Sequence, residues 1–326
     1  MAGQEYGTAS LGGNLSLPYL TDWFRVTAQP LMRFRQACDV KEAIGTGKGN
    51  TFQWDIIANV ATQGTTLVET NTMPATNFTI TKGSCTVYEF GNSIPLTRLL
   101  KEMSEIEVKQ LLRKSLVNDM PKAYDQYIYN NCIKTTPLIA QADGGTDTAL
   151  AELMTDGTGD AANAASCWLH TGHITSLVDL MKERNIPAFD GENYLCIAHP
   201  TTLTSLRNSL VSINQYTNLG YTKILSGEIG SYGGVRFVEQ TNVAKVTPTN
   251  AGAGSWAAFI GGEAIVEAVS VPDELIEKEV TDYKRSLGLA WYGITGFTPA
   301  FPHSYTTGSD DVRIVLWWTN ASNPAA

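Results

Sequence analysis

Apolar and polar side chains alternate along residues 52–56, where Phe52, Trp54 and Ile56 are separated by polar residues. A period of two indicates a strand with one buried face. The following segment, 59–77, carries no charged residue except Glu69. Further strands rich in Thr and β-branched residues are expected nearby, at residues 65–70, 77–81 and 86–90. The pattern therefore predicts a long, extended, hairpin-like excursion.

A helical period replaces this alternation over residues 105–131. Ser104 and Glu107 have the spacing of a capping box, which satisfies free backbone N–H groups at a helix start. Behind them apolar residues recur at helical spacing, and we expect Leu112 to be buried in that stripe. Pro121 should end or kink the helix, yet the apolar spacing continues past it. A helix of this length would extend about 40 Å, which suits a spine.

Strand and helix patterns are mixed in the second half of the chain. Residues 141–166 consist largely of Gly, Ala, Asp and Thr without a period, which indicates a loop or linker. Helices are expected at 174–184 and 201–210, and strands at 194–198, 235–239, 256–260, 264–271, 276–283, 287–292 and 312–318. The middle portion of the chain is therefore predicted to be α/β or α+β, and strands dominate from residue 256 onward.

The composition describes a globular chain that has few charges. It has 326 residues and 43% hydrophobic residues, enough for one large domain or two ordinary ones. No apolar run approaches the roughly 18 residues of a membrane helix, and the start lacks the order of a signal peptide, so we expect a soluble protein made in the cytoplasm. The net charge of −9 argues against a bulk electrostatic grip on nucleic acid or anionic lipid. Only 17% of residues are charged, which favours a surface partly covered by partner subunits.

One set of Cys and His residues has the two-residue gaps found in zinc sites. The candidate ligands are Cys167, His170, His173, Cys196 and His199. Five ligands are one too many for a tetrahedral site, Gly172 interrupts the first group, and Pro200 follows the last His. We therefore expect buried thiols and imidazoles that satisfy nearby backbone groups, and no metal.

Other catalytic motifs are incomplete. Residues 45–50 (GTGKGN) lack the hydroxyl residue of a phosphate-binding loop, and a predicted strand follows where such a loop needs a helix. A Gly-x-Ser-x-Gly nucleophile motif is missing as well. The five cysteines are an odd number spread widely, which argues against a disulfide framework. We assign no catalytic, cofactor-binding or metal-ligating residue and expect no enzyme.

The order of these parts, and two stretches of sequence, carry a family resemblance. In residues 177–207 (LVDLMKERNIPAFDGENYLCIAHPTTLTSLR) a helix and an Ile-Pro…Gly turn lead into a strand that ends in His-Pro. Residues 227–230 (GEIG) and 233–239 (GGVRFVE) follow as a second block. Both blocks are similar to a podovirus-type capsid family. The chain thus resembles the major capsid (coat) proteins of tailed bacteriophages, which share the Hong Kong 97-like fold.

The resemblance implies a division into parts. Residues 1–35 would be the N-terminal arm and 36–97 the extended β-hairpin loop. Residues 98–137 and 270–326 would form the peripheral domain with its spine helix, and 138–269 the axial domain. The covalent crosslinking of the type member is not implied, because no matching set of Lys, Asn and Glu is found.

The resemblance also implies a structural function. Copies of the chain would self-assemble into pentamers and hexamers of an icosahedral head, which encloses double-stranded DNA without binding it specifically. Scaffolding, portal and possibly decoration proteins would be partners, with no membrane involved. The protein would belong to the virion and be assembled in the host cytoplasm. The alternatives are an encapsulin-like nanocompartment shell, which a cargo peptide would favour, and a cytosolic metal-dependent enzyme, which bound zinc would favour.

Overall fold

The computed structural model describes residues 33–43, 49–57, 64–70, 72–73, 75–103, 108–143, 150–154, 167–214, 230–243, 255–278, 283, 285–301 and 311–319. The expected arm before Arg33, the glycine-rich run at 44–48 and the expected capping box at 104–107 lie outside these residues. No helix in the described ranges is long and apolar enough to cross a membrane.

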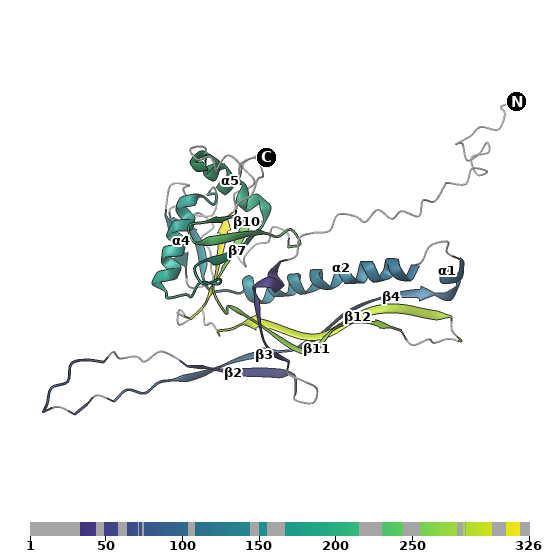
Figure 1. The fold of residues 1–326 in the computed structure, drawn as a ribbon, viewed down its shortest axis with the longest axis horizontal. Helices are drawn as coiled ribbons and strands as arrows, with labels where there is room; N and C mark the ends of the chain where they lie inside the picture. The colour runs from purple at the N-terminus through teal and green to yellow at the C-terminus, as the bar shows by residue number, and fades with distance from the viewer. Residues whose placement is uncertain are drawn as a thin grey trace.

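A seven-stranded sheet forms the compact part of the molecule (Figure 1). Its strand order is β6-β5-β13-β10-β7-β9-β8. The strands are β5 (Ile139–Ala142), β6 (Ala151–Met154), β7 (Tyr194–Ala198), β8 (Ser231–Tyr232), β9 (Val235–Glu239), β10 (Ser255–Ile260) and β13 (Ile314–Thr319). Strands β7 and β9 occupy the residues predicted from the sequence.

Both faces of this sheet are covered, which explains why β7 is apolar at every position. Tyr194 and Cys196 pack with helices α4 (Thr171–Glu183) and α5 (Pro200–Asn214) in one core. Leu195 points to the other face and joins a second core. A strand that is buried on both faces needs no polar alternation.

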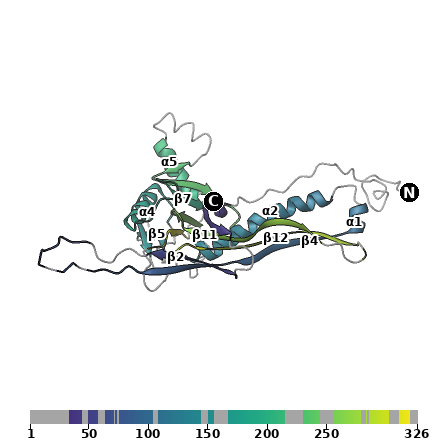
Figure 2. The same cartoon turned by 60° about the horizontal axis from the view of Figure 1, so that its bottom comes forward.

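A four-stranded sheet extends from the compact part and has the order β1-β11-β12-β4. Its strands are β1 (Cys38–Ala43), β4 (Tyr88–Thr97), β11 (Ile265–Glu277) and β12 (Ser286–Pro299). Helix α2 lies along one face of this long sheet, and the short helix α1 lies at its far end (Figures 1 and 2). The second core fills the space between α2, the long sheet and the compact part.

The predicted spine helix exists, and its described part is α2 with the turn that follows it. Helix α2 spans Val108–Ile128, passes through Pro121 without a break and continues into a π-helical turn, Tyr129–Ile133. At 21 residues it is about 30 Å long. It rests on the sheet with one side, so Leu116 is fully buried whereas Leu112 is half-buried.

The predicted excursion has a paired base. Strands β2 (Thr51–Ile57) and β3 (Ile80–Thr86) pair in antiparallel register from Thr51↔Thr86 to Ile57↔Ile80. The strand predicted at 65–70 is wrong, because residues 64–70 form loop and turn. The hairpin projects from the molecule on the side away from α1 (Figures 1 and 2).

Three further differences concern local boundaries. The loop predicted at 141–166 contains β6, whose four residues are too few to show a period. The strand predicted at 276–283 is instead the end of β11, which stops at Glu277. The segment 270–326 is divided between the sheets, because β12 lies in the long sheet whereas β13 pairs with β10 in the seven-stranded sheet.

Candidate assembly surfaces

The Cys and His residues singled out from the sequence lie in and beside the core of the seven-stranded sheet. Cys167, Cys196 and His173 are buried, and His173 Nδ1 accepts a hydrogen bond from the backbone N–H of His170 at 3.2 Å. The Nδ1 atom of His199 lies 2.8 Å from the hydroxyl of Thr201. Within the described ranges, no three His, Cys, Asp or Glu side chains are grouped so that they could hold a metal ion. The absence of a metal therefore remains a prediction.

The thiols sit in environments that oppose ionisation. Burial raises the pKa of Cys132 and of Cys196 far above the usual thiol range, and raises that of Cys38 as well. Burial also raises the pKa of Cys85 to about 11. None of the five cysteines, which all lie in the described ranges, forms a disulfide. Since the thiolate is the nucleophile and the metal ligand, the raised pKa values oppose both reactions at these four thiols near neutral pH.

Asp125 is a buried carboxylate on α2 that joins three parts of the fold. Its Oδ1 accepts the backbone N–H groups of Arg33 at 3.0 Å and Phe34 at 2.8 Å. Its Oδ2 accepts hydrogen bonds from the side-chain amides of Gln240 and Asn242, which follow β9. Burial raises the pKa of Asp125, and the four hydrogen bonds act against that rise. Asp125 therefore fixes both the first described residues and the end of β9 onto the spine helix.

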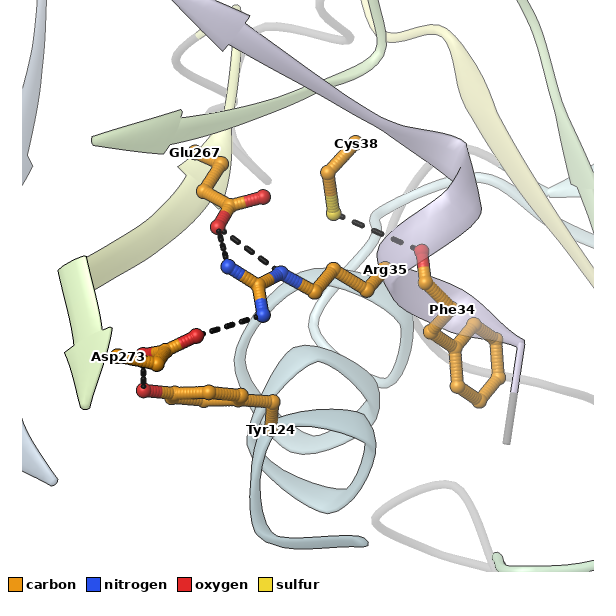
Figure 3. A network of polar contacts seen from close by, with 6 residues as sticks. All are labelled: Phe34, Arg35, Cys38, Tyr124, Glu267 and Asp273. Atoms are coloured by element: carbon orange, nitrogen blue, oxygen red, sulfur yellow. Dashed lines mark hydrogen bonds and ion pairs between the residues drawn. The ribbon is translucent and has the colours of Figure 1, made fainter. Parts of the chain in front are cut away.

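A second polar group surrounds Arg35 (Figure 3). The guanidinium donates from Nε at 3.0 Å and from Nη2 at 2.7 Å to Oε1 of Glu267, and from Nη1 at 2.9 Å to Oδ2 of Asp273. The hydroxyl of Tyr124 donates to the other oxygen of Asp273. The guanidinium carbon also lies 5.1 Å from the centre of the Tyr124 ring. These contacts hold the 3-10 helix Phe34–Ala37 against β11 and α2.

Sequence reasoning missed both polar groups. The available signal was a carboxylate, Asp125, between the apolar residues Tyr124 and Ile128 of the predicted helical stripe. Its partners lie about a hundred residues away in the chain, so spacing alone does not identify them.

The excursion has an anchored base and an uncovered tip. At the base, Phe52 and Trp54 pack against a small core of Cys85, Val87 and Ala268, and Trp54 Nε1 donates to the carbonyl of Ala300 at 3.0 Å. Towards the tip, large apolar side chains are between 53% and 71% exposed. They are Ile57, Leu67, Val68, Met73, Phe78 and Ile80. Large exposed apolar side chains gathered on one segment indicate an interaction site.

The opposite end of the molecule also exposes apolar side chains. Helix α1 (Arg98–Met103) carries Leu99, Leu100 and Met103, which are 70%, 53% and 78% exposed. Figures 1 and 2 both place α1 at the end of the long sheet that is remote from the β2–β3 hairpin. Different apolar surfaces at opposite ends permit heterologous, head-to-tail contacts between copies, which form rings when the rotation between copies closes.

The long sheet has one face without a helix. Paired residues of antiparallel strands point to the same face, and Trp291 and Leu289 of β12 face α2. Ala290 and Gly288 therefore point the other way, opposite Ser93 and Pro95 of β4. The small side chains of Gly288, Ala290 and Ser93 leave room over this part of the face, so another chain can approach it there.

Comparison with solved structures identifies the fold to which this architecture belongs. No protein-family model matches the sequence, and no curated protein matches it either. Among solved structures, a chain of the head of Helicobacter pylori bacteriophage KHP40 matches with a TM-score of 0.68 and 12% identity, covering 98% of this chain and 99% of that chain. The chain has the Hong Kong 97-like capsid fold.

Two further structures have the same fold over nearly their whole length. The capsid of Helicobacter pylori bacteriophage KHP30 matches with a TM-score of 0.67 and 12% identity, covering 97% of this chain and 99% of that chain. The capsid of Ralstonia phage GP4 matches with a TM-score of 0.63 and 15% identity, covering 98% and 99%. The capsid fold that the sequence resemblance implied is thus confirmed.

Proposed function

We propose that this chain is the major capsid protein of a tailed bacteriophage, which self-assembles into the pentamers and hexamers of an icosahedral head around double-stranded DNA. One observation carries the proposal: the capsid fold extends over nearly the whole chain, and its two ends expose apolar side chains that nothing in the described part of the subunit covers. Exposure of this extent is unfavourable in a free monomer and is relieved by contacts between copies.

The parts of the subunit have the following proposed roles. The seven-stranded sheet with α4 and α5 is the axial domain at the capsomer centre. The long sheet with α2 is the peripheral domain, β2 and β3 carry the extended loop, and the residues before Arg33 form the arm. In these assignments β13 joins the axial domain and β4 the peripheral domain, because each pairs within that sheet.

The extended loop is the element proposed to join neighbouring subunits. Its base is held in its own subunit by Trp54, so the loop leaves the molecule in a fixed direction. The hairpin lies on the side of the long sheet away from α2 (Figure 1). A neighbour placed in the same orientation therefore offers the helix-free face of its long sheet to the apolar tip.

The remaining proposed roles are those of a structural protein of a phage head. The chain is a structural component of the virion and not an enzyme. It is assembled in the host cytoplasm with a scaffolding protein and joined to a portal, with decoration proteins as possible additions to the outer surface.

Removal of the loop tip tests this function. Because Ile57 pairs with Ile80, residues 58–79 are replaced by Asn-Gly, which closes a two-residue hairpin turn in the existing register. The subunit should melt as the unmodified protein does, since the described tip residues lie outside the cores. Closed shells should be lost, because the tip belongs to an interface. Thermal unfolding, particle sizing and electron microscopy measure both effects.

Two triple variants separate the effect of the apolar side chains on shell closure from the effect of loop length. Replacement of Leu67, Val68 and Phe78 by Ser keeps the loop but removes apolar contact area, and should also prevent shell closure. The matched control Thr66→Ser/Thr70→Ser/Thr79→Ser changes neighbouring exposed positions and should form normal shells. Normal shells from the shortened protein would contradict the proposed role of the loop.

A further inference from the structure

A single charge stands at the tip of the extended loop. Between Ile57 and Ile80, the last paired residues of the hairpin, Glu69 is the only charged residue. It lies in a turn halfway along that segment and is exposed. The two residues before it, Leu67 and Val68, are 58% and 59% exposed. A carboxylate therefore lies within the apolar surface that the loop presents to another chain.

Covering that surface changes the environment of the charge. In the free subunit Glu69 is exposed to water. When the apolar side chains around it pack against a neighbour, much of that water is removed, and a carboxylate left without a partner is then strongly unfavourable. Charges in an interface are arranged opposite charges of the other sign, which also fixes the register of the two partners. The surface that receives the tip must therefore offer a cation.

The helix-free face of the long sheet is poor in cations. Strands β4, β11 and β12 contain no Lys and no Arg. Glu89 and Glu274 point to this face, because Phe90 and Asp273 beside them contact Tyr124 on the α2 side. A neighbour's Glu69 is therefore repelled where these carboxylates lie.

The first cation of this face follows directly after β11. Lys278 is exposed, and its Cβ lies 3.6 Å from the place that a Cβ on Gly288 would take. It therefore points away from α2, whereas Glu277 before it pairs with Lys109 of that helix at 3.0 Å. The Nζ atom of Lys278 donates to the hydroxyl of Ser286 at 2.8 Å. No carboxylate in the described ranges is in an ion pair with Lys278, so its charge remains available to another chain.

We propose that Glu69 at the loop tip forms an ion pair with Lys278 of a neighbouring subunit, and that this pair sets how far the loop extends along the neighbour's long sheet. The inference rests on the proposed capsid function, which brings the tip onto the helix-free face. Lys278 attracts the tip, whereas Glu274, four residues earlier and about 13 Å away along the strand, repels it. Attraction at one place and repulsion at another select a single register.

The loop is long enough for this contact. Glu69 stands eleven residues before Ile80, and an extended chain covers about 3.3 Å per residue, or about 36 Å over this length. On the long sheet, Ile294 packs with the hairpin base of its own subunit. Gly288 lies six residues before Ile294, or about 20 Å away along β12. The tip can therefore span the free part of a neighbour's face and reach its end.

Charge reversal in shells formed with a scaffolding protein tests the pair. Glu69→Lys and Lys278→Glu should each lower the yield of sedimenting shells about tenfold, because like charges then face each other. The double variant Glu69→Lys/Lys278→Glu restores opposite charges and should return the yield to within about threefold of the unmodified protein. The control Glu69→Lys/Lys182→Glu also keeps the net charge of −9, but Lys182 lies on α4, so this control should not recover. Thermal unfolding of unassembled subunits should be the same for all variants.

Zero-length carbodiimide crosslinking of unmodified shells gives an independent readout. The reagent joins a carboxylate directly to an amine in contact with it, so mass spectrometry should find Glu69 joined to Lys278 in shells and not in unassembled subunits. Glu69 joined to another lysine, normal shells from both single reversals, or no recovery in the double variant would overturn the inference while leaving the capsid function intact. Absence of shells from the unmodified protein would instead contradict the capsid function, and the inference would fall with it.

Discussion

Replacement of Asp125 by Asn tests whether the buried carboxylate holds the fold together through its acceptors. All four of its hydrogen bonds need an acceptor, two at Oδ1 and two at Oδ2. The Asn side chain has only one oxygen, which can accept from one pair of donors. Its NH₂ group then faces the other pair of donors and cannot accept from them. Gln240 cannot rotate its own amide to compensate, because its oxygen already accepts the backbone N–H of Val243 at 3.2 Å.

The expected loss follows from the groups left without a partner. A buried donor that loses its acceptor costs about 1–3 kcal/mol. The burial that raises the pKa of Asp125 also makes its charge unfavourable. Because the Asn side chain is neutral, it avoids the cost of burying a charge, which offsets part of this loss. We therefore expect Asp125→Asn to lower the free energy of unfolding by about 1–3 kcal/mol.

Asp119→Asn is the matched control on the same helix. Both donors to Asp119 reach the same oxygen, Oδ2, so an amide oxygen can take that place. Its effect should stay within about 0.5 kcal/mol, as for an ordinary surface site. Urea unfolding of unassembled subunits gives both values. Equal destabilisation by the two variants, or none by Asp125→Asn, would refute the reasoning.

Two further predictions concern the core and the thiols. Leu116→Ala should lower stability by about 2–5 kcal/mol through lost burial and a cavity, while Leu111→Ala, at a side chain 44% exposed, should cost under about 1 kcal/mol; similar values in denaturant unfolding would mean that α2 packs differently. Cys85, whose pKa is raised to about 11, and the buried Cys132 and Cys196 should react slowly with a disulfide reagent at pH 8 in the folded protein, whereas all five cysteines should react at once after unfolding; rapid labelling of Cys196 in the native state would contradict its burial.

The sequence was informative where structure is set by neighbouring residues. The strand Tyr194–Ala198 is apolar throughout and is followed by His199 and Pro200, so its type and its end were both predictable. The alternation of apolar and polar residues around Trp54 is also a pattern of neighbouring residues, and it predicted β2. The segment after it, which carries no charge except Glu69, lies between the paired strands β2 and β3, as predicted for a hairpin-like excursion.

The sequence failed where distant contacts decide the outcome. The sequence left open whether Pro121 would kink helix α2; the helix passes through it without a break, because Tyr124 and Ile128 are packed against the long sheet and hold the following turns in place. Strand β6 has only four residues and exists because it pairs with β5. The Asp125 contacts join residues 91 and 115 positions apart, and no local pattern encodes such pairing.

Cryo-electron microscopy of the purified full-length protein, co-expressed with its scaffolding protein, tests the capsid function most directly. We predict closed icosahedral shells built of pentamers and hexamers, in which the loop between β2 and β3 of each subunit lies on the long sheet of a neighbour. A uniform monomer at all protein and salt concentrations, with the scaffolding protein present, would contradict the account.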